Sequence, residues 1–99
     1  MNGLIIKEPY ATKIVTGKKK LEYRKTPIPK KKIGETVYIL TPKKDGCKIV
    51  GQATFYPSNQ GETTWRVIDP IKIDEDITYK PKSGCVIWIN NVEEIIKDD

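Results

Sequence analysis

The segment from Gly17 to Arg24 gathers the side chains of this chain that are best suited to polar chemistry. Its sequence, GKKKLEYR, combines a glycine, a run of lysines, one carboxylate and one guanidinium. On a β-strand, Glu22 and Arg24 project from the same face because they are two residues apart. Together with Lys19 at the preceding turn, they form a small site that can bind a polar ligand. The alternative is an exposed ion pair, which contributes little to stability.

Each of these three side chains suits a nucleotide. The flexible ammonium of Lys19 suits a phosphate or a ring carbonyl. Glu22 can accept hydrogen bonds from base amino groups, as Glu does from cytosine N4, and Arg24 offers a planar fork to phosphates or base edges. If the site is catalytic, the candidates are Lys19, as base or electrostatic stabiliser, and Glu22 as its partner.

Two residues nearer the N-terminus complete the predicted ligand-binding set. Lys7 stands at the end of the first predicted strand and can point into the same cleft; otherwise it is a solubilising charge at a strand end. Tyr10, in the first turn of a predicted helix, can stack on a base, as in single-strand RNA recognition, or pack half-buried on the body. The set is therefore Lys7, Tyr10, Lys19, Glu22 and Arg24.

The elements that position these residues are a short strand and a short helix. Residues 3–7 predict a buried strand, and Glu8-Pro9 opens a helix, since proline at the first helical position loses no hydrogen bond. Apolar residues spaced three and four apart give this helix one buried face, formed by Ala11, Ile14 and Val15. Gly17 ends the helix in the position that favours a left-handed backbone.

The rest of the chain predicts mostly strands. Alternation and β-branched composition favour strands at 20–24, 36–40, 47–56, 63–68 and 86–89, with turns at 42–46 and 57–61. Gly51 indicates a bulge or a close approach, Trp65 and Trp88 are expected in the core, and residues 69–84 are expected to form an acidic loop anchored by Ile71, Ile73 and Ile77. One helix and five to seven strands predict a single domain, residues 1–99, of the α+β class, mainly β: a small β-barrel.

Composition excludes several chemistries. The chain has no histidine, which excludes histidine triads and histidine-ligated zinc. Cys47 and Cys85 alone make a poor zinc site, and both are expected to be buried free thiols. No metal and no cofactor are predicted. The N-terminus has too short an apolar stretch for a signal peptide, and no run is long enough for a membrane span, so a cytoplasmic location without membrane contact is expected.

The charge is distributed unevenly along the chain. The net charge is +5, but residues 1–50 carry 13 Lys and Arg against 4 Asp and Glu, and residues 51–99 carry 5 against 9. A basic half of this kind attracts polyanions, of which nucleic acid is the commonest; the alternative is that lysine-rich loops keep a small domain soluble. The acidic half could instead dock a basic protein partner.

The same segments resemble the ASCH domain family. The stretch IKEPYA (6–11) is similar to that family's opening, and GKKKLEYR matches its G-x-K-x-x-E-x-R signature at Gly17, Lys19, Glu22 and Arg24. The stretches GETVYI (34–39) and IVGQA (49–53) are similar to two of its later strands. Trp88 and Val92 stand where a closing strand with tryptophan is common, so the resemblance covers nearly the whole chain.

This resemblance implies a fold and a class of ligand. It implies a PUA-like β-barrel that recognises RNA or modified nucleosides in a cleft between helix and barrel. Some members are small hydrolases of acylated cytidine, and ribonuclease activity is also associated with the family. The hydrolases carry threonine where this chain has Glu22. We therefore expect an RNA- or nucleotide-binding module, with DNA as a possible ligand and with a hydrolase or ribonuclease as the alternative; the oligomeric state stays open.

Overall fold

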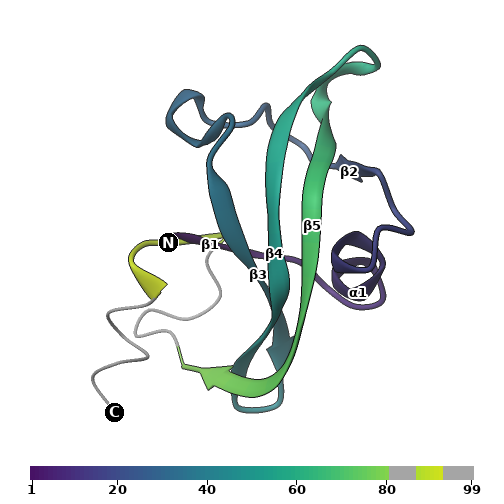
Figure 1. The fold of residues 1–99 in the computed structure, drawn as a ribbon. Coiled ribbons are helices and arrows are strands. Elements are labelled where there is room, and N and C mark those ends of the chain that lie inside the picture. The colour runs from purple at the N-terminus through teal and green to yellow at the C-terminus, as the bar shows by residue number, and fades with distance from the viewer. Residues whose placement is uncertain (81–86, 93–99) are drawn as a thin grey trace.

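The computed structural model describes residues 1–80 and 87–92. In these residues one short helix accompanies a six-stranded sheet (Figure 1). The elements follow one another in this order: β1 (Gly3–Ile5), α1 (Tyr10–Val15), β2 (Leu21–Tyr23), a 3-10 turn (Lys30–Lys32), β3 (Thr36–Lys43), β4 (Gly46–Ser58), β5 (Gly61–Tyr79) and β6 (Trp88–Ile89).

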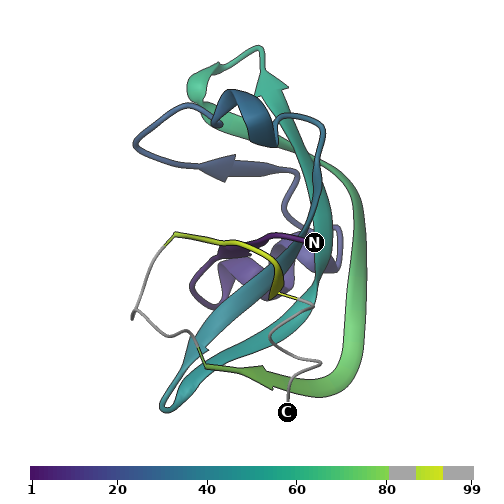
Figure 2. The same ribbon diagram turned by 90° about the vertical axis from the view of Figure 1, so that its left-hand side faces the viewer.

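The sheet runs in the order β2-β5-β4-β3-β1-β6. Strands β1 and β3 pair in parallel and the other neighbours are antiparallel. Figure 2 shows the sheet curling through β3, β4 and β5, so that β2 at one edge faces β1 and β6 across the concave side. The predicted mainly β, PUA-like barrel with a short N-terminal helix is confirmed, in the form of a half-barrel.

Helix α1 begins at Tyr10, so Pro9 precedes the helix and is not its first residue as predicted, whereas the buried face and the terminal glycine lie where the sequence predicts them. Glu8 accepts hydrogen bonds from the backbone N–H and the hydroxyl of Thr12, which satisfies a donor that the first turn leaves open. Gly17 follows the helix with φ of +80°, the left-handed conformation expected of it. Ala11, Ile14 and Val15 are the buried residues of the helix. So short a helix is held mainly by this packing rather than by propensity.

A close approach at Gly51 fits the helix and the long strand β5 to β4. A Cβ atom at this position would lie 2.2 Å from the carbonyl oxygen of Ile71 and 2.6 Å from Cγ1 of Val15. The pairing register also shifts between Ile49 and Gly51, which is a β-bulge or irregularity. Of the two alternatives expected at Gly51, a bulge or a close approach, the close approach is confirmed.

The prediction of a loop at 69–84 is wrong as far as residue 79, because β5 continues to Tyr79. Asp69 and Pro70 indicate a break, and Asp69 does take a positive φ of 49°. Irregular registers between β4 and β5 absorb this bend, so pairing resumes beyond it. Of the three expected anchors, Ile73 and Ile77 pack against the core, whereas Ile71 is 53% exposed.

The turns are shorter than predicted. Strand β3 extends to Lys43 and pairs there with Gly46, and β4 extends to Ser58. Long strands with tight hairpins allow the sheet to curl without losing its ladder of hydrogen bonds.

The core consists of two clusters of buried residues, one of which includes the buried face of α1. Trp65 is buried, as predicted, and makes an edge-to-face contact with Phe55 and a stacked contact with Trp88. Trp88 is only partly buried. Cys47 is buried, as predicted, and Cys85 lies outside the described residues. No helix within the described residues is long and apolar enough to span a membrane.

Candidate functional site

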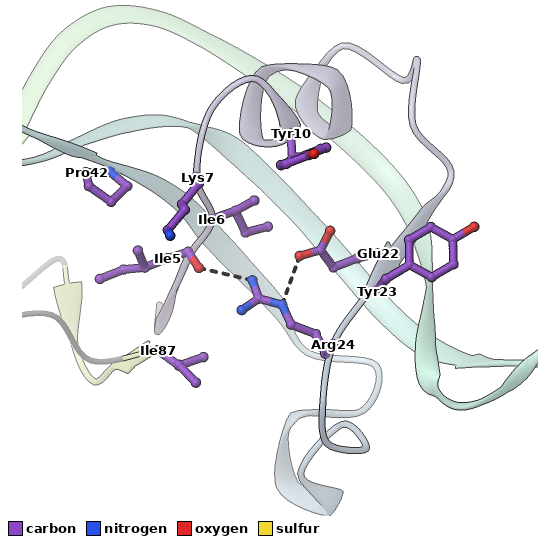
Figure 3. A pocket seen from close by; sticks show the side chains of 9 residues that line it. All are labelled: Ile5, Ile6, Lys7, Tyr10, Glu22, Tyr23, Arg24, Pro42 and Ile87. Carbon is purple, nitrogen blue, oxygen red and sulfur yellow. Dashed lines mark hydrogen bonds and ion pairs between the residues drawn. The ribbon is translucent and has the colours of Figure 1, made fainter.

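A pocket of about 350 Å³ opens between the edge strand β2 and strand β1 (Figure 3). Because β2 and β1 are not paired with each other, this is the place where the curled sheet stays open. Of the predicted ligand-binding set, Lys7, Tyr10, Glu22 and Arg24 line this pocket. The other residues that line it are Ile5, Ile6, Tyr23, Pro42 and Ile87.

Glu22 lies in this pocket because of its register on β2. It is paired with Trp65 of β5, and its side chain is directed to the inner face of the sheet. The residue is only 5% exposed. A buried carboxylate needs charged partners. Lys19 supplies one, with Nζ 2.7 Å from Oε1, and Arg24 the other, with Nε 2.9 Å from Oε2.

Arg24 connects the two strands that flank the pocket. Its Nη2 donates to the carbonyl oxygen of Ile5 at 3.0 Å, and its guanidinium carbon lies 5.6 Å from the ring centroid of Trp65. One side chain from the end of β2 therefore reaches β1, the core tryptophan and Glu22 together. In a closed sheet, backbone hydrogen bonds would join β2 to β1. Here the guanidinium of Arg24 makes a hydrogen bond between the two sides of the opening instead.

Lys19 binds Glu22 but is not among the residues that line the first pocket. Its ammonium lies 5.4 Å from the ring centroid of Tyr10 and 5.1 Å from that of Tyr23. It lines a second pocket, of about 370 Å³. Lys20 and Arg66 also line that pocket, with Gly17, Leu21, Val67, Ile68 and Pro70. Lys19 thus stands between the two pockets.

Two aromatic rings are exposed at the first pocket. Tyr10 is 51% exposed and Tyr23 is 63% exposed. Sequence reasoning proposed Tyr10 but missed Tyr23, because alternation places it on the outer face of β2. Its neighbours Glu22 and Arg24 do face inward, as the spacing predicts. Tyr23 is nevertheless part of the pocket rim, because β2 is an edge strand.

The remaining wall of the first pocket is apolar and was also missed. Ile5 and Ile6 come from β1 and the residue after it, Pro42 from β3, and Ile87 precedes β6. Sequence reasoning treated these residues as core or turn. Their position in a shared wall depends on the parallel pairing of β1 with β3, which brings segments distant in sequence together.

A protein-family model of the ASCH domain matches residues 4–98. This chain belongs to the ASCH domain family. The match spans nearly the whole chain, so the described fold is that of an ASCH domain. The family is PUA-like, and its members generally bind RNA. The comparison with curated proteins finds no match to this chain.

Proposed function

We propose that this ASCH domain binds single-stranded RNA by holding one base in the pocket between β1 and β2. The observation that carries the proposal is Glu22, a nearly buried carboxylate in the pocket, with two exposed tyrosines at the rim. Glu22 offers hydrogen-bond acceptors to a base edge, and Tyr10 and Tyr23 offer faces for stacking. The ligand set proposed from sequence thereby gains Tyr23.

The charges around the pocket favour an anionic ligand. Lys19 and Arg24 together exceed the charge of Glu22 by one unit, and Lys7 adds a further cation to the lining. The basic first half of the chain supplies additional lysines on exposed loops. Such a surface attracts phosphates in a way that weakens with salt.

The geometry favours recognition over catalysis. The Lys19 side chain donates a hydrogen bond to Glu22 at 2.7 Å, and it does not line the pocket in which the proposal places the base. A hydroxyl nucleophile, which the hydrolase relatives are expected to place at the position of Glu22, is replaced here by a carboxylate. The proposed role is therefore a binding module acting in the cytoplasm.

The test is the affinity for a short single-stranded RNA, measured by fluorescence anisotropy over a salt series. We expect binding at low salt that weakens as salt rises, and weaker binding by the Lys7→Ala and Tyr10→Ala variants. Lys44→Ala is the matched control, because Lys44 is exposed in the turn between β3 and β4 and does not line the pocket. A DNA strand of the same sequence, measured in parallel, determines the sugar preference.

Two results would contradict the proposal. One is the absence of RNA binding at low salt. The other is an affinity for RNA that is as high in the Lys7→Ala and Tyr10→Ala variants as in the Lys44→Ala variant. Incubation with acylated cytidine and with RNA tests the alternative, since turnover that is lost in Lys19→Ala would indicate an enzyme.

A further inference from the structure

The acceptor positions that remain on Glu22 bear on which base the pocket can hold. An ionised carboxylate has about four acceptor positions on its two oxygens. Among the described residues, Lys19 occupies one position on Oε1 and Arg24 lies against Oε2. Each oxygen therefore keeps acceptor capacity, and Figure 3 shows the carboxylate directed into the space between Tyr10 and Arg24.

A carboxylate with both oxygens available is best matched by two neighbouring N–H donors. Guanine presents such a pair on its Watson–Crick edge, at N1 and N2. Cytosine and adenine present one amino group beside a ring nitrogen acceptor, and uracil presents one N–H between two carbonyl oxygens. In those three bases a lone pair would face the second carboxylate oxygen, which is unfavourable in a buried site.

The cations beside Glu22 complete the match. Guanine carries the acceptor O6 next to N1, and this oxygen needs a donor beyond the carboxylate. Lys19 and Arg24 flank the two carboxylate oxygens, at 2.7 and 2.9 Å, so a donor is present beside either one. The exposed faces of Tyr10 and Tyr23 favour a purine as well, since its larger ring system offers more area for stacking.

We infer that the pocket between β1 and β2 selects guanine, with Glu22 as the residue that determines this specificity. This inference rests on the proposed function, because it names the base that the same pocket takes. In it, N1 and N2 of guanine donate to the two oxygens of Glu22, O6 accepts from one of the flanking cations, and the ring stacks on tyrosine.

The ligand itself provides the first test, without changing the protein. Calorimetry of the unmodified chain compares guanosine, inosine, adenosine, cytidine and uridine 5′-monophosphates. Inosine keeps N1–H and O6 but lacks the N2 amino group, so it should bind about tenfold more weakly than guanosine because one hydrogen bond to a charged group is lost. The other three should be weaker than inosine.

A conservative variant provides the second test. Glu22→Gln removes one acceptor and adds a donor, so we expect the preference for guanosine over inosine to fall toward one. Glu35→Gln is the matched control, because Glu35 pairs with Lys32 at 4.0 Å and does not line the pocket. For each variant, tyrosine fluorescence and a thermal transition that match those of the unmodified chain would verify that it is folded.

The outcomes separate this inference from the proposed function. Equal affinity for all five monophosphates, or tightest binding of cytidine or adenosine, overturns guanine selection and leaves RNA binding intact. A guanosine preference that Glu22→Gln preserves overturns the role of Glu22. If neither the monophosphates nor single-stranded RNA binds, the proposed function fails and the inference fails with it.

Discussion

At the residue scale, Glu22 ties the stability of the fold to the chemistry of the pocket. The carboxylate is nearly buried, and its charge is balanced by Lys19 on one oxygen and Arg24 on the other. Removing one partner of a buried pair leaves a charge that is poorly solvated, which costs more than the pair itself contributes. The same three residues therefore hold the edge strand in place, and in the proposed function Glu22 presents acceptors and the two cations present donors to the ligand.

Arg24→Ala should destabilise the domain by about 2 kcal/mol, because it removes a cation from Glu22 and the link to the Ile5 carbonyl oxygen. Urea denaturation followed by tryptophan fluorescence measures this loss. In a Glu22→Gln background the same substitution should cost less, since the carboxylate that loses its contact with the guanidinium is then already absent.

Lys32→Ala serves as the comparison for Arg24→Ala. The Lys32–Glu35 pair spans 4.0 Å, and its carboxylate is 34% exposed against 7% for that of Glu22, so its loss should cost less than about 1 kcal/mol. Equal losses for the two variants would contradict a structural role of Arg24 across the opening of the sheet.

Tyr79 makes the stability of the fold depend on alkaline pH. Burial, and secondarily the neighbouring Cys47, raises the pKa of Tyr79 above its ordinary value of 10.0. The folded state then favours the neutral phenol, so this contribution is complete below about pH 10 and is lost as pH rises through the raised pKa. The unfolding free energy of the Tyr79→Phe variant should therefore decrease less steeply with rising alkaline pH than that of the unmodified chain.

The control for Tyr79 is Tyr23→Phe, because Tyr23 is 63% exposed. Urea denaturation at a series of alkaline pH values compares the slopes of the two variants with that of the unmodified chain. If Tyr79→Phe keeps the full slope, the alkaline loss of stability arises from other groups.

At the element scale, the predictions that depended on local chemistry were confirmed. Helix α1 has its buried face and its terminal glycine where spacing and residue type place them, and Gly51 has the predicted close approach. The prediction for β5 was wrong because Asp69 and Pro70 are local break signals. Pairing with β4 on both sides of the bend overrides them, and pairing is not a local property of the sequence.

The residues of the pocket divide in the same way, into those that local sequence predicts and those that depend on the tertiary fold. Two-residue spacing correctly placed Glu22 and Arg24 on one face, and their contact with Lys19 follows from the turn at Gly17. The apolar wall and Tyr23 were missed, because they depend on how far the sheet curls and on which strands form its edges. Whether these residues bind a ligand stays a prediction.

Gly51→Ala tests how closely α1, β4 and β5 pack. The new methyl group would meet the backbone oxygen of Ile71 at 2.2 Å and the Val15 side chain at 2.6 Å, so backbone must move. We expect a loss of about 3 kcal/mol or more in urea denaturation. Gly17→Ala is the control: a Cβ there meets nothing within 4 Å, so only the positive φ opposes it, at about 1 kcal/mol. Equal losses would contradict tight packing at Gly51.

At the scale of the whole molecule, Lys19 connects two pockets, because it lines the second and binds Glu22, which lines the first. The first holds Glu22 and the tyrosines, and the second is lined by Lys19, Lys20 and Arg66 above an apolar floor. In the proposed function the first pocket takes the nucleotide base. The second, with three cations, would then take the phosphates of neighbouring nucleotides.

The proposed function therefore predicts that a strand of RNA contacts more lysine and arginine side chains than a single nucleotide does. Lys20→Ala and Arg66→Ala should weaken binding of a short single-stranded RNA and make its affinity less dependent on salt, with little effect on guanosine 5′-monophosphate. Lys30→Ala, which removes an exposed lysine from the 3-10 turn that lines neither pocket, is the control. If Lys30→Ala lowers the salt dependence as much as Lys20→Ala does, the RNA is attracted by the general charge of the basic half and follows no defined path past β2.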